Sequence, residues 1–189
     1  MKLILGINAQ RASINSERLK KLKVGLAKKN LEHRFVEPSS YHISLINLGD
    51  IKEEEFQERD VYFKNIIQQT ESFDLKLNGI WAYPNQTEAR LLWVGVQNSR
   101  ELNDLQFHLS MQIPSICELD YKPILPIVRM RSHHSVTDII SPYKGKDFGR
   151  LQVDNISLYE MTTSGAYPTY KIIKSYYLAA AGNVVDLGM

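Results

Sequence analysis

A histidine and a serine two positions apart, His42 and Ser44, have the residue types and the spacing for phosphate chemistry. They lie in the string Tyr41-His42-Ile43-Ser44-Leu45, which alternates polar and apolar side chains. On a β-strand, positions i and i+2 point to the same face of the sheet. A neighbouring imidazole and hydroxyl can hold a phosphate, the hydroxyl by donating a hydrogen bond and the imidazole by moving a proton. The alternative is a half-exposed surface histidine with no chemical role.

Cleavage of a phosphoester without a metal needs two groups that handle protons. One group activates the nucleophile and the other protonates the leaving oxygen. A chain built of two similar halves could supply one His-x-Ser or His-x-Thr pair from each half. The elements that would position such pairs can be predicted from the apolar periodicity of the sequence.

The first half of the chain predicts strands over residues 2–7, 33–36 and 41–48. Asn15 or Ser16 can cap a helix whose leucines repeat at helical spacing. Asp50, followed by Glu53, marks the start of a second helix that extends to about residue 70.

The second half shows a similar order, with strands over residues 74–80, 90–96, 151–161 and 169–178 and an apolar run over 124–130. Pro84 and Asn85 mark a turn, and Asn98 with Glu101 marks the start of a helix. Strands and helices mixed in this way predict an α+β fold in which helices flank a sheet.

Composition limits the possible functions. The chain has 189 residues and a net charge of +2, from 23 Lys and Arg against 21 Asp and Glu. This balance excludes a strongly basic protein that coats nucleic acid, but it allows a small phosphate site.

The single cysteine, Cys117, excludes an internal disulfide and a Cys-rich zinc site. No apolar run reaches the ~18 residues of a membrane span. We therefore expect a cytoplasmic protein that does not bind membranes.

Several strings together resemble the two-histidine (2H) phosphoesterase superfamily. Residues 34–38, 41–45 and 48–50 are similar to its first motif and the segment before it. Residues 92–96 resemble its mid-chain strand, and residues 148–149, 153–159 and 165–178 resemble its closing strands. The resemblance covers roughly residues 1 to 178. It is closest to the bacterial branch called 2′-5′ RNA ligases or RNA 2′,3′-cyclic phosphodiesterases.

The resemblance implies two pseudo-symmetric lobes of antiparallel sheet, with flanking helices, around a central cleft. We expect residues 1–178 to form a single domain of two lobes and residues 179–189 to form a C-terminal tail. The implied ligands are RNA ends or nucleotide 2′,3′-cyclic phosphates. The implied chemistry is hydrolysis of the cyclic phosphate, or its reversal as ligation, without a metal or other cofactor. We expect the protein to be a monomer.

The second motif departs from the family pattern. That pattern begins with an aromatic residue, any residue, Pro and His, continues with an apolar residue and then Thr or Ser, and closes with a run that ends in Arg. This chain reads Tyr121-Lys122-Pro123-Ile124-Leu125-Pro126-Ile127-Val128-Arg129. Ile124 therefore stands at the histidine position and Pro126 at the hydroxyl position. The same number of positions separates His42 from Ile124 and Ser44 from Pro126, which supports this alignment. Isoleucine cannot move a proton, and proline lacks both a hydroxyl and a backbone donor.

The candidate catalytic residues are thus His42 and Ser44, and one of the two expected proton handlers is missing. One such group is typically worth ~10²–10⁴-fold in rate, so any remaining turnover would be slow. His133 and His134 with Ser135 form a second His-x-Ser and could substitute, although a polar loop with two exposed histidines is the simpler interpretation.

The candidate substrate-binding residues are an arginine that could hold a phosphate and three aromatics that could stack on a base: Arg129, Tyr41, Phe35 and Tyr170. The alternatives for these residues are a surface ion pair and ordinary packing. Four functions remain open: an enzyme with a degraded second motif, a non-catalytic module that binds nucleotides or RNA, an enzyme with relocated residues, and a protein-interaction domain that kept only the fold.

Overall fold

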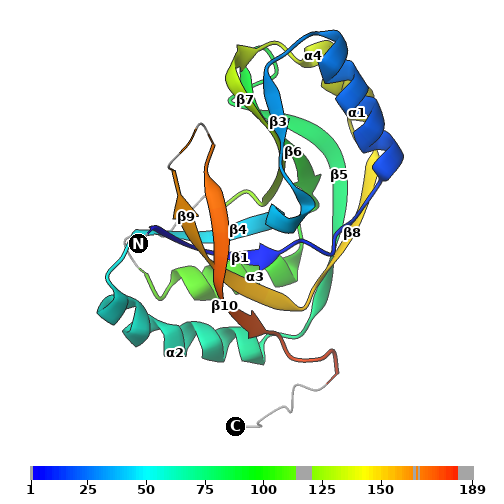
Figure 1. The fold of residues 1–189 in the computed structure, drawn as a ribbon. Coiled ribbons are helices and arrows are strands. Elements are labelled where there is room, and N and C mark those ends of the chain that lie inside the picture. The colour runs from blue at the N-terminus through cyan, green and yellow to red at the C-terminus, as the bar shows by residue number, and fades with distance from the viewer. Residues whose placement is uncertain (1, 114–120, 164, 166, 183–189) are drawn as a thin grey trace.

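Alternating apolar side chains build two antiparallel sheets, shown in Figure 1. The computed structural model describes residues 2–113, 121–163, 165 and 167–182. The strands are β1 (Lys2–Asn8), β2 (Ser13–Ile14), β3 (His33–Phe35), β4 (His42–Asp50), β5 (Phe73–Tyr83), β6 (Ala89–Val96), β7 (Ile124–His134), β8 (Asp147–Val153), β9 (Asn155–Thr162) and β10 (Thr169–Tyr177). The helices are α1 (Ser16–Lys28), α2 (Glu53–Gln69), α3 (Arg100–Ser110) and α4 (Thr137–Ile140), with short 3₁₀ turns at Pro38–Ser40 and Ser141–Tyr143.

Each sheet forms one lobe, and both lobes draw strands from both parts of the chain. One sheet has the order β10-β9-β1-β4, and the other has the order β2-β8-β5-β6-β7-β3. Helices α2 and α3 lie against the four-stranded sheet, and α1 lies against the six-stranded one (Figure 1). The predicted α+β fold with two lobes of antiparallel sheet is confirmed. However, the lobes are not the first and second halves of the chain.

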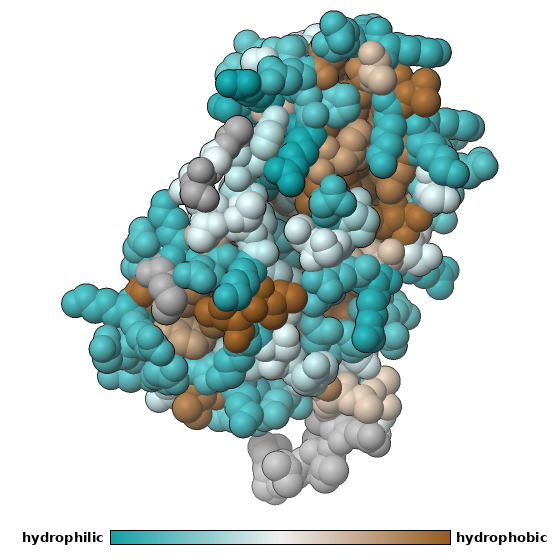
Figure 2. All heavy atoms as spheres, viewed as in Figure 1, coloured by the Kyte–Doolittle hydropathy of each residue, from teal (hydrophilic) through white to brown (hydrophobic). Residues whose placement is uncertain are grey.

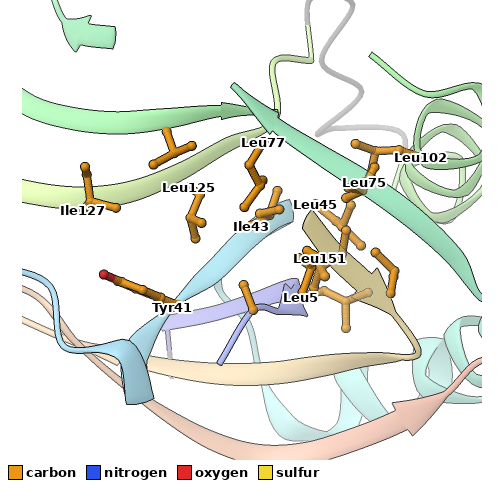
Figure 3. Close-up of a cluster of buried hydrophobic side chains, with 14 of the residues drawn as sticks. Leu5, Tyr41, Ile43, Leu45, Leu75, Leu77, Leu102, Leu125, Ile127 and Leu151 are labelled. Carbon is orange, nitrogen blue, oxygen red and sulfur yellow. The ribbon is translucent and has the colours of Figure 1, made fainter. Parts of the chain in front are cut away.

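The two lobes are joined by a shared hydrophobic core. Ile43 and Leu45 of β4 lie close to Leu77 of β5 and to Leu125 of β7, as Figure 3 shows. These side chains are all nearly inaccessible to solvent. Burial of a large aliphatic side chain contributes about 1.5–3 kcal/mol, so this cluster holds β4 and β7 at a defined distance from each other.

Several predicted boundaries change in the structure. The predicted strand over residues 151–161 is two strands, because the chain passes from the six-stranded to the four-stranded sheet at Asp154. Asp50 does not cap α2; it ends β4, where it pairs with Lys2 of β1. Helix α3 is capped by Ser99, one residue after the predicted Asn98, and the Ser99 side chain accepts a hydrogen bond from the backbone N–H of Leu102.

Other local predictions are confirmed. Asn15 caps α1 by accepting a hydrogen bond from the backbone N–H of Arg18. Asn85 forms the turn between β5 and β6, and its side-chain oxygen accepts hydrogen bonds from Thr87 and Glu88. Ala179, the first residue of the expected tail, donates a hydrogen bond to the carbonyl of Thr70 and accepts one from the N–H of Ser72, and the tail boundary stays a prediction.

The surface in view is predominantly hydrophilic, with hydrophobic residues gathered between β3 and α1 (Figure 2). Among the described residues, no helix is both long enough and apolar enough to cross a membrane.

Substitution of Gly6 tests how closely β1 and β4 approach beneath the site. A Cβ atom at Gly6 would lie 2.9 Å from the carbonyl oxygen of Ile43. We expect Gly6→Ala to lower the free energy of unfolding by about 1–3 kcal/mol, because the backbone must move to relieve this contact. Urea denaturation measures the change. Gly165→Ala is the matched control, since nothing lies within 4 Å of a Cβ there. Equal stability of the two variants would contradict the close approach.

Candidate functional site

A cavity of about 110 Å³ opens where the start of β4 approaches β3, β7 and the start of β10. Its wall combines aromatic, cationic and hydroxyl side chains with one histidine. The residues are Arg34, Phe35, Val36, Glu37, Ser40, His42, Pro126, Arg129, Tyr167, Pro168, Thr169 and Tyr170. The cavity therefore brings together His42, Arg129, Phe35 and Tyr170, four of the residues that we predicted from the sequence.

His42 reaches the cavity because Ile43 and Leu45 occupy the core face of β4, which leaves His42 on the opposite face. The side chain is only 5% exposed. Its Nδ1 atom lies 2.9 Å from the carbonyl oxygen of Ser40. A carbonyl can only accept a hydrogen bond, so Nδ1 carries a proton. In the neutral ring, Nε2 then carries the lone pair and is the atom that can accept a proton.

Two tyrosine rings enclose the imidazole of His42. The ring of Tyr159 lies 4.8 Å from that of His42 between centroids, and the ring of Tyr170 lies 4.4 Å away. Tyr159 comes from β9 and Tyr170 from β10, so the four-stranded sheet supplies all three rings. Burial raises the pKa of Tyr159 to about 12, so this phenol stays neutral at physiological pH.

The charge state of His42 follows from this enclosure. Burial lowers the pKa of His42 below its ordinary value of 6.5, and the positive charge of Arg129 lowers the pKa further. The hydrogen bond to Ser40 acts in the opposite direction but is weaker than the burial. The imidazole is therefore neutral at pH 7, as a proton acceptor must be.

Arg129 faces the cavity because β7 contains a bulge. Trp93 of β6 pairs with Pro126, but the neighbouring Leu92 of β6 pairs with Val128. The extra residue on β7 shifts by one position which side chains point to each face of the sheet. Pro126 and Arg129 therefore line the same cavity wall although they are three positions apart. The guanidinium of Arg129 donates a hydrogen bond to the hydroxyl of Tyr170 at 3.2 Å.

Ser44 and Ile124 lie beside the cavity rather than in its wall. Ser44 is half-buried, and its backbone carbonyl accepts a hydrogen bond from the hydroxyl of Tyr121 at 3.0 Å. Ile124 is half-buried two positions before Pro126 on β7, where it pairs with Gly95. The assignment of Ser44 as a catalytic residue stays a prediction.

Tyr41 does not belong to the cavity. It is 6% exposed and lies in the hydrophobic core, as Figure 3 shows, because it precedes β4 on the same face as Ile43. The expectation that Tyr41 stacks on a base is therefore corrected. Phe35 does line the cavity, and its ring also lies 4.8 Å from the ammonium of Lys23.

The second His-x-Ser lies elsewhere. His133 and His134 form the end of β7, whereas we expected a polar loop, and the hydroxyl of Ser132 lies 2.8 Å from Nε2 of His134. Ser135 is exposed between β7 and α4. None of the three is among the residues that line the cavity around His42.

Sequence reasoning missed Tyr159, Arg34 and Thr169. These residues lie in strings that resemble the family, but nothing in those strings marks them as site residues. The pairing of β9 with β1 and of β3 with β7 brings Tyr159 and Arg34 near the cavity. Within the described part of the chain, no three His, Cys, Asp or Glu side chains are grouped as metal ligands would be.

Comparisons with known proteins agree with this fold. Residues 13–93 match the model of the family described as LigT-like phosphoesterase. The chain is 26% identical over 151 residues to an RNA 2′,3′-cyclic phosphodiesterase of Methanothermobacter thermautotrophicus, a match that covers 77% of this chain and 82% of that protein. It is 28% identical over 177 residues to an RNA 2′,3′-cyclic phosphodiesterase of Aquifex aeolicus, covering 88% of this chain and 92% of that protein.

Solved structures show the same arrangement of elements. A crystal structure of the Thermus thermophilus protein TT0787 aligns with a TM-score of 0.73 at 16% identity, over 96% of this chain and 100% of that chain. The apo form of LigT from E. coli aligns with a TM-score of 0.66 at 19% identity, over 94% of this chain and 97% of that chain. A second crystal structure of E. coli LigT is a complex with 3′-AMP. In its sequence matches and its two-lobed fold, the chain is similar to the LigT-like phosphoesterases.

Proposed function

We propose that this chain binds the phosphate at an RNA end or of a nucleotide 2′,3′-cyclic phosphate, in the cavity between His42 and Arg129. The observation that carries the proposal is the convergence of a neutral imidazole and a guanidinium in one cavity. The relatives named RNA 2′,3′-cyclic phosphodiesterase and the LigT complex with 3′-AMP support this class of ligand.

The two groups have complementary roles toward a phosphate. The guanidinium of Arg129 donates charge-assisted hydrogen bonds to the non-bridging oxygens. His42 offers the lone pair of Nε2 to a water molecule or a ribose hydroxyl, while Ser40 holds the ring by accepting the hydrogen bond from Nδ1. Tyr159 and Tyr170 keep solvent away from the imidazole and so preserve its neutral form.

Hydrolysis of a cyclic phosphate at this site would use His42 as a general base. His42 takes a proton from water as the new bond between oxygen and phosphorus forms. The bond from phosphorus to one ribose oxygen then breaks, and that oxygen takes a proton from solvent. In an intact 2H site a second histidine would supply this proton. Ile124 and Pro126 cannot, so turnover is slow.

A binding function without turnover is the second candidate. The presence of Pro126 in the cavity wall favours it, because the wall there offers neither a hydroxyl nor a backbone N–H to a developing charge. Both candidates use the same cavity and the same class of ligand, and they differ only in whether His42 turns the ligand over.

We further infer that the protein acts as a cytoplasmic monomer, in which residues 1–178 form one domain and residues 179–189 form a tail. The continuous core shared by both lobes supports a single domain. The single cysteine fits a reducing compartment.

Removal of Arg129 or His42 should separate binding from turnover. We expect Arg129→Ala to weaken binding of adenosine 2′,3′-cyclic phosphate about 10- to 100-fold, because a hydrogen bond to a charged group is lost. We expect His42→Ala to retain most of the binding and to abolish turnover. Calorimetry at low salt measures binding, and phosphorus NMR follows ring opening. Arg100→Ala, on the exposed face of α3, is the control. Absence of binding would refute the proposal, and absence of turnover above the His42→Ala background would leave only the binding function.

The protonation of His42 can be measured directly. NMR titration of the imidazole should give a midpoint below 6.5, because burial disfavours the charged form. Arg129→Ala should raise that midpoint, since it removes a positive charge that lowers the pKa of His42. Turnover that depends on His42 as a base should therefore persist as the pH falls to 6.5 and decline only below it. A midpoint at or above 6.5 would contradict the neutral-base role.

Restoration of the second motif tests the alignment of β7. We expect Ile124→His combined with Pro126→Thr to raise turnover by about 10²–10⁴-fold, because a second proton handler returns to the cleft. Pro126→Thr alone is the matched control, and His42→Ala in the restored protein should remove the gain. A folded double variant without any gain would show that the alignment is wrong. Ile124→His alone gives the same test if the double variant does not fold.

A further inference from the structure

A second hollow of about 380 Å³ adjoins the cavity around His42. The two share Arg129, Tyr167 and Pro168 in their walls. Beyond these residues the hollow is lined by Tyr83, Arg90 and Arg131, among others, and we call it the Tyr83 groove. The groove therefore borders the proposed phosphate site.

The groove exists because β6 and β7 separate after Arg129. Leu91 pairs with Arg129, but the next pair between these strands is Ala89 with His134. Over this interval β6 advances by two residues and β7 by five, so the backbone of β7 must bulge away from β6. The bulge leaves Arg90 of β6 and Arg131 of β7 at the edges of an open space.

The groove combines an exposed aromatic ring with cations. Tyr83 is 62% exposed, so its ring is available to a ligand. Burial of an aromatic ring is favourable, and a ligand that stacks on this ring would gain from it. Arg90 is exposed and forms no ion pair with any residue that the structure describes. Arg131 forms an ion pair with Glu32 at 3.1 Å in which both side chains are well exposed to water. Such a pair contributes little and competes weakly with a phosphate.

We infer that the Tyr83 groove binds the nucleotide that precedes the terminal one in an RNA strand whose end occupies the His42 cavity. This inference rests on the proposed function. An aromatic face beside guanidinium groups is the arrangement that holds single-stranded nucleic acid, since each base can stack and each phosphate can pair with a cation. Arg129 lines both spaces, so one strand that passes this side chain can occupy both. The protein then prefers an oligonucleotide end to a free nucleotide.

Two ligands with the same end test the inference: adenosine 2′,3′-cyclic phosphate and an RNA trinucleotide that terminates in it. We expect the full chain to bind the trinucleotide more tightly, and Tyr83→Ala to weaken trinucleotide binding roughly 5- to 100-fold while leaving the mononucleotide unchanged. Tyr83→Phe should retain the affinity, because the stacking ring remains. Tyr62→Ala, which removes a similarly exposed tyrosine from α2, should change neither affinity.

The salt dependence gives a second readout. For a single strand, each phosphate contact contributes about −0.7 to the slope of log K against log salt concentration. Arg90→Ala should therefore make the slope for the trinucleotide shallower by about 0.7. Arg90→Lys keeps the positive charge and should leave the slope unchanged. Equal affinities of the mononucleotide and the trinucleotide would overturn the inference. It would also be overturned if Tyr83→Ala weakened binding of these two ligands equally, or if an acidic peptide bound as tightly as the trinucleotide. In those cases mononucleotide binding, and with it the proposed function, still stands. Failure of both RNA ligands to bind would refute the two proposals together.

Discussion

The alternation of side chains along β4 is the constraint on which the site depends. Ile43 and Leu45 are buried in the core between the lobes, so His42 and Ser44 must lie on the other face of the strand. A slip of one residue would move both aliphatic side chains out of the core between the lobes and turn His42 and Ser44 into it, at a cost of several kcal/mol. The core therefore determines the direction of the imidazole as firmly as it determines the fold.

The same burial determines the chemistry of His42. Two tyrosine rings and the nearby Arg129 disfavour the imidazolium, while Ser40 selects the tautomer with a free Nε2. A neutral base close to a guanidinium suits a phosphate ligand, because the arginine attracts the anion without protonating the histidine. The Tyr83 groove extends this electrostatic pattern along β6 and β7, where a separation of the strands provides the space.

The predicted loss of the second motif is compatible with the architecture, because core positions and cavity-side positions alternate along this part of β7. Leu125 and Ile127 occupy the core face of β7, and Ile124 and Pro126 share the other face. Pro126 lies next to the bulge and beyond the pairing with β3, which extends only from Val128 to Met130. Proline is tolerated in such places. Ile124 and Pro126 therefore fit β7 without disturbing the lobes.

The sequence by itself determined what depends on neighbouring residues: the alternation of β4, the shared face of His42 and Ser44, the Asn15 cap and the Asn85 turn. Motifs along the chain also indicated the resemblance to the 2H phosphoesterases. Tertiary structure decided the rest. It placed Tyr159 and Tyr170 against His42, turned Tyr41 into the core and brought Arg129 to the cavity through a bulge. The reason is physical: periodicity and capping are local, whereas strand pairing, crossover between sheets and bulges depend on contacts between residues far apart in the chain.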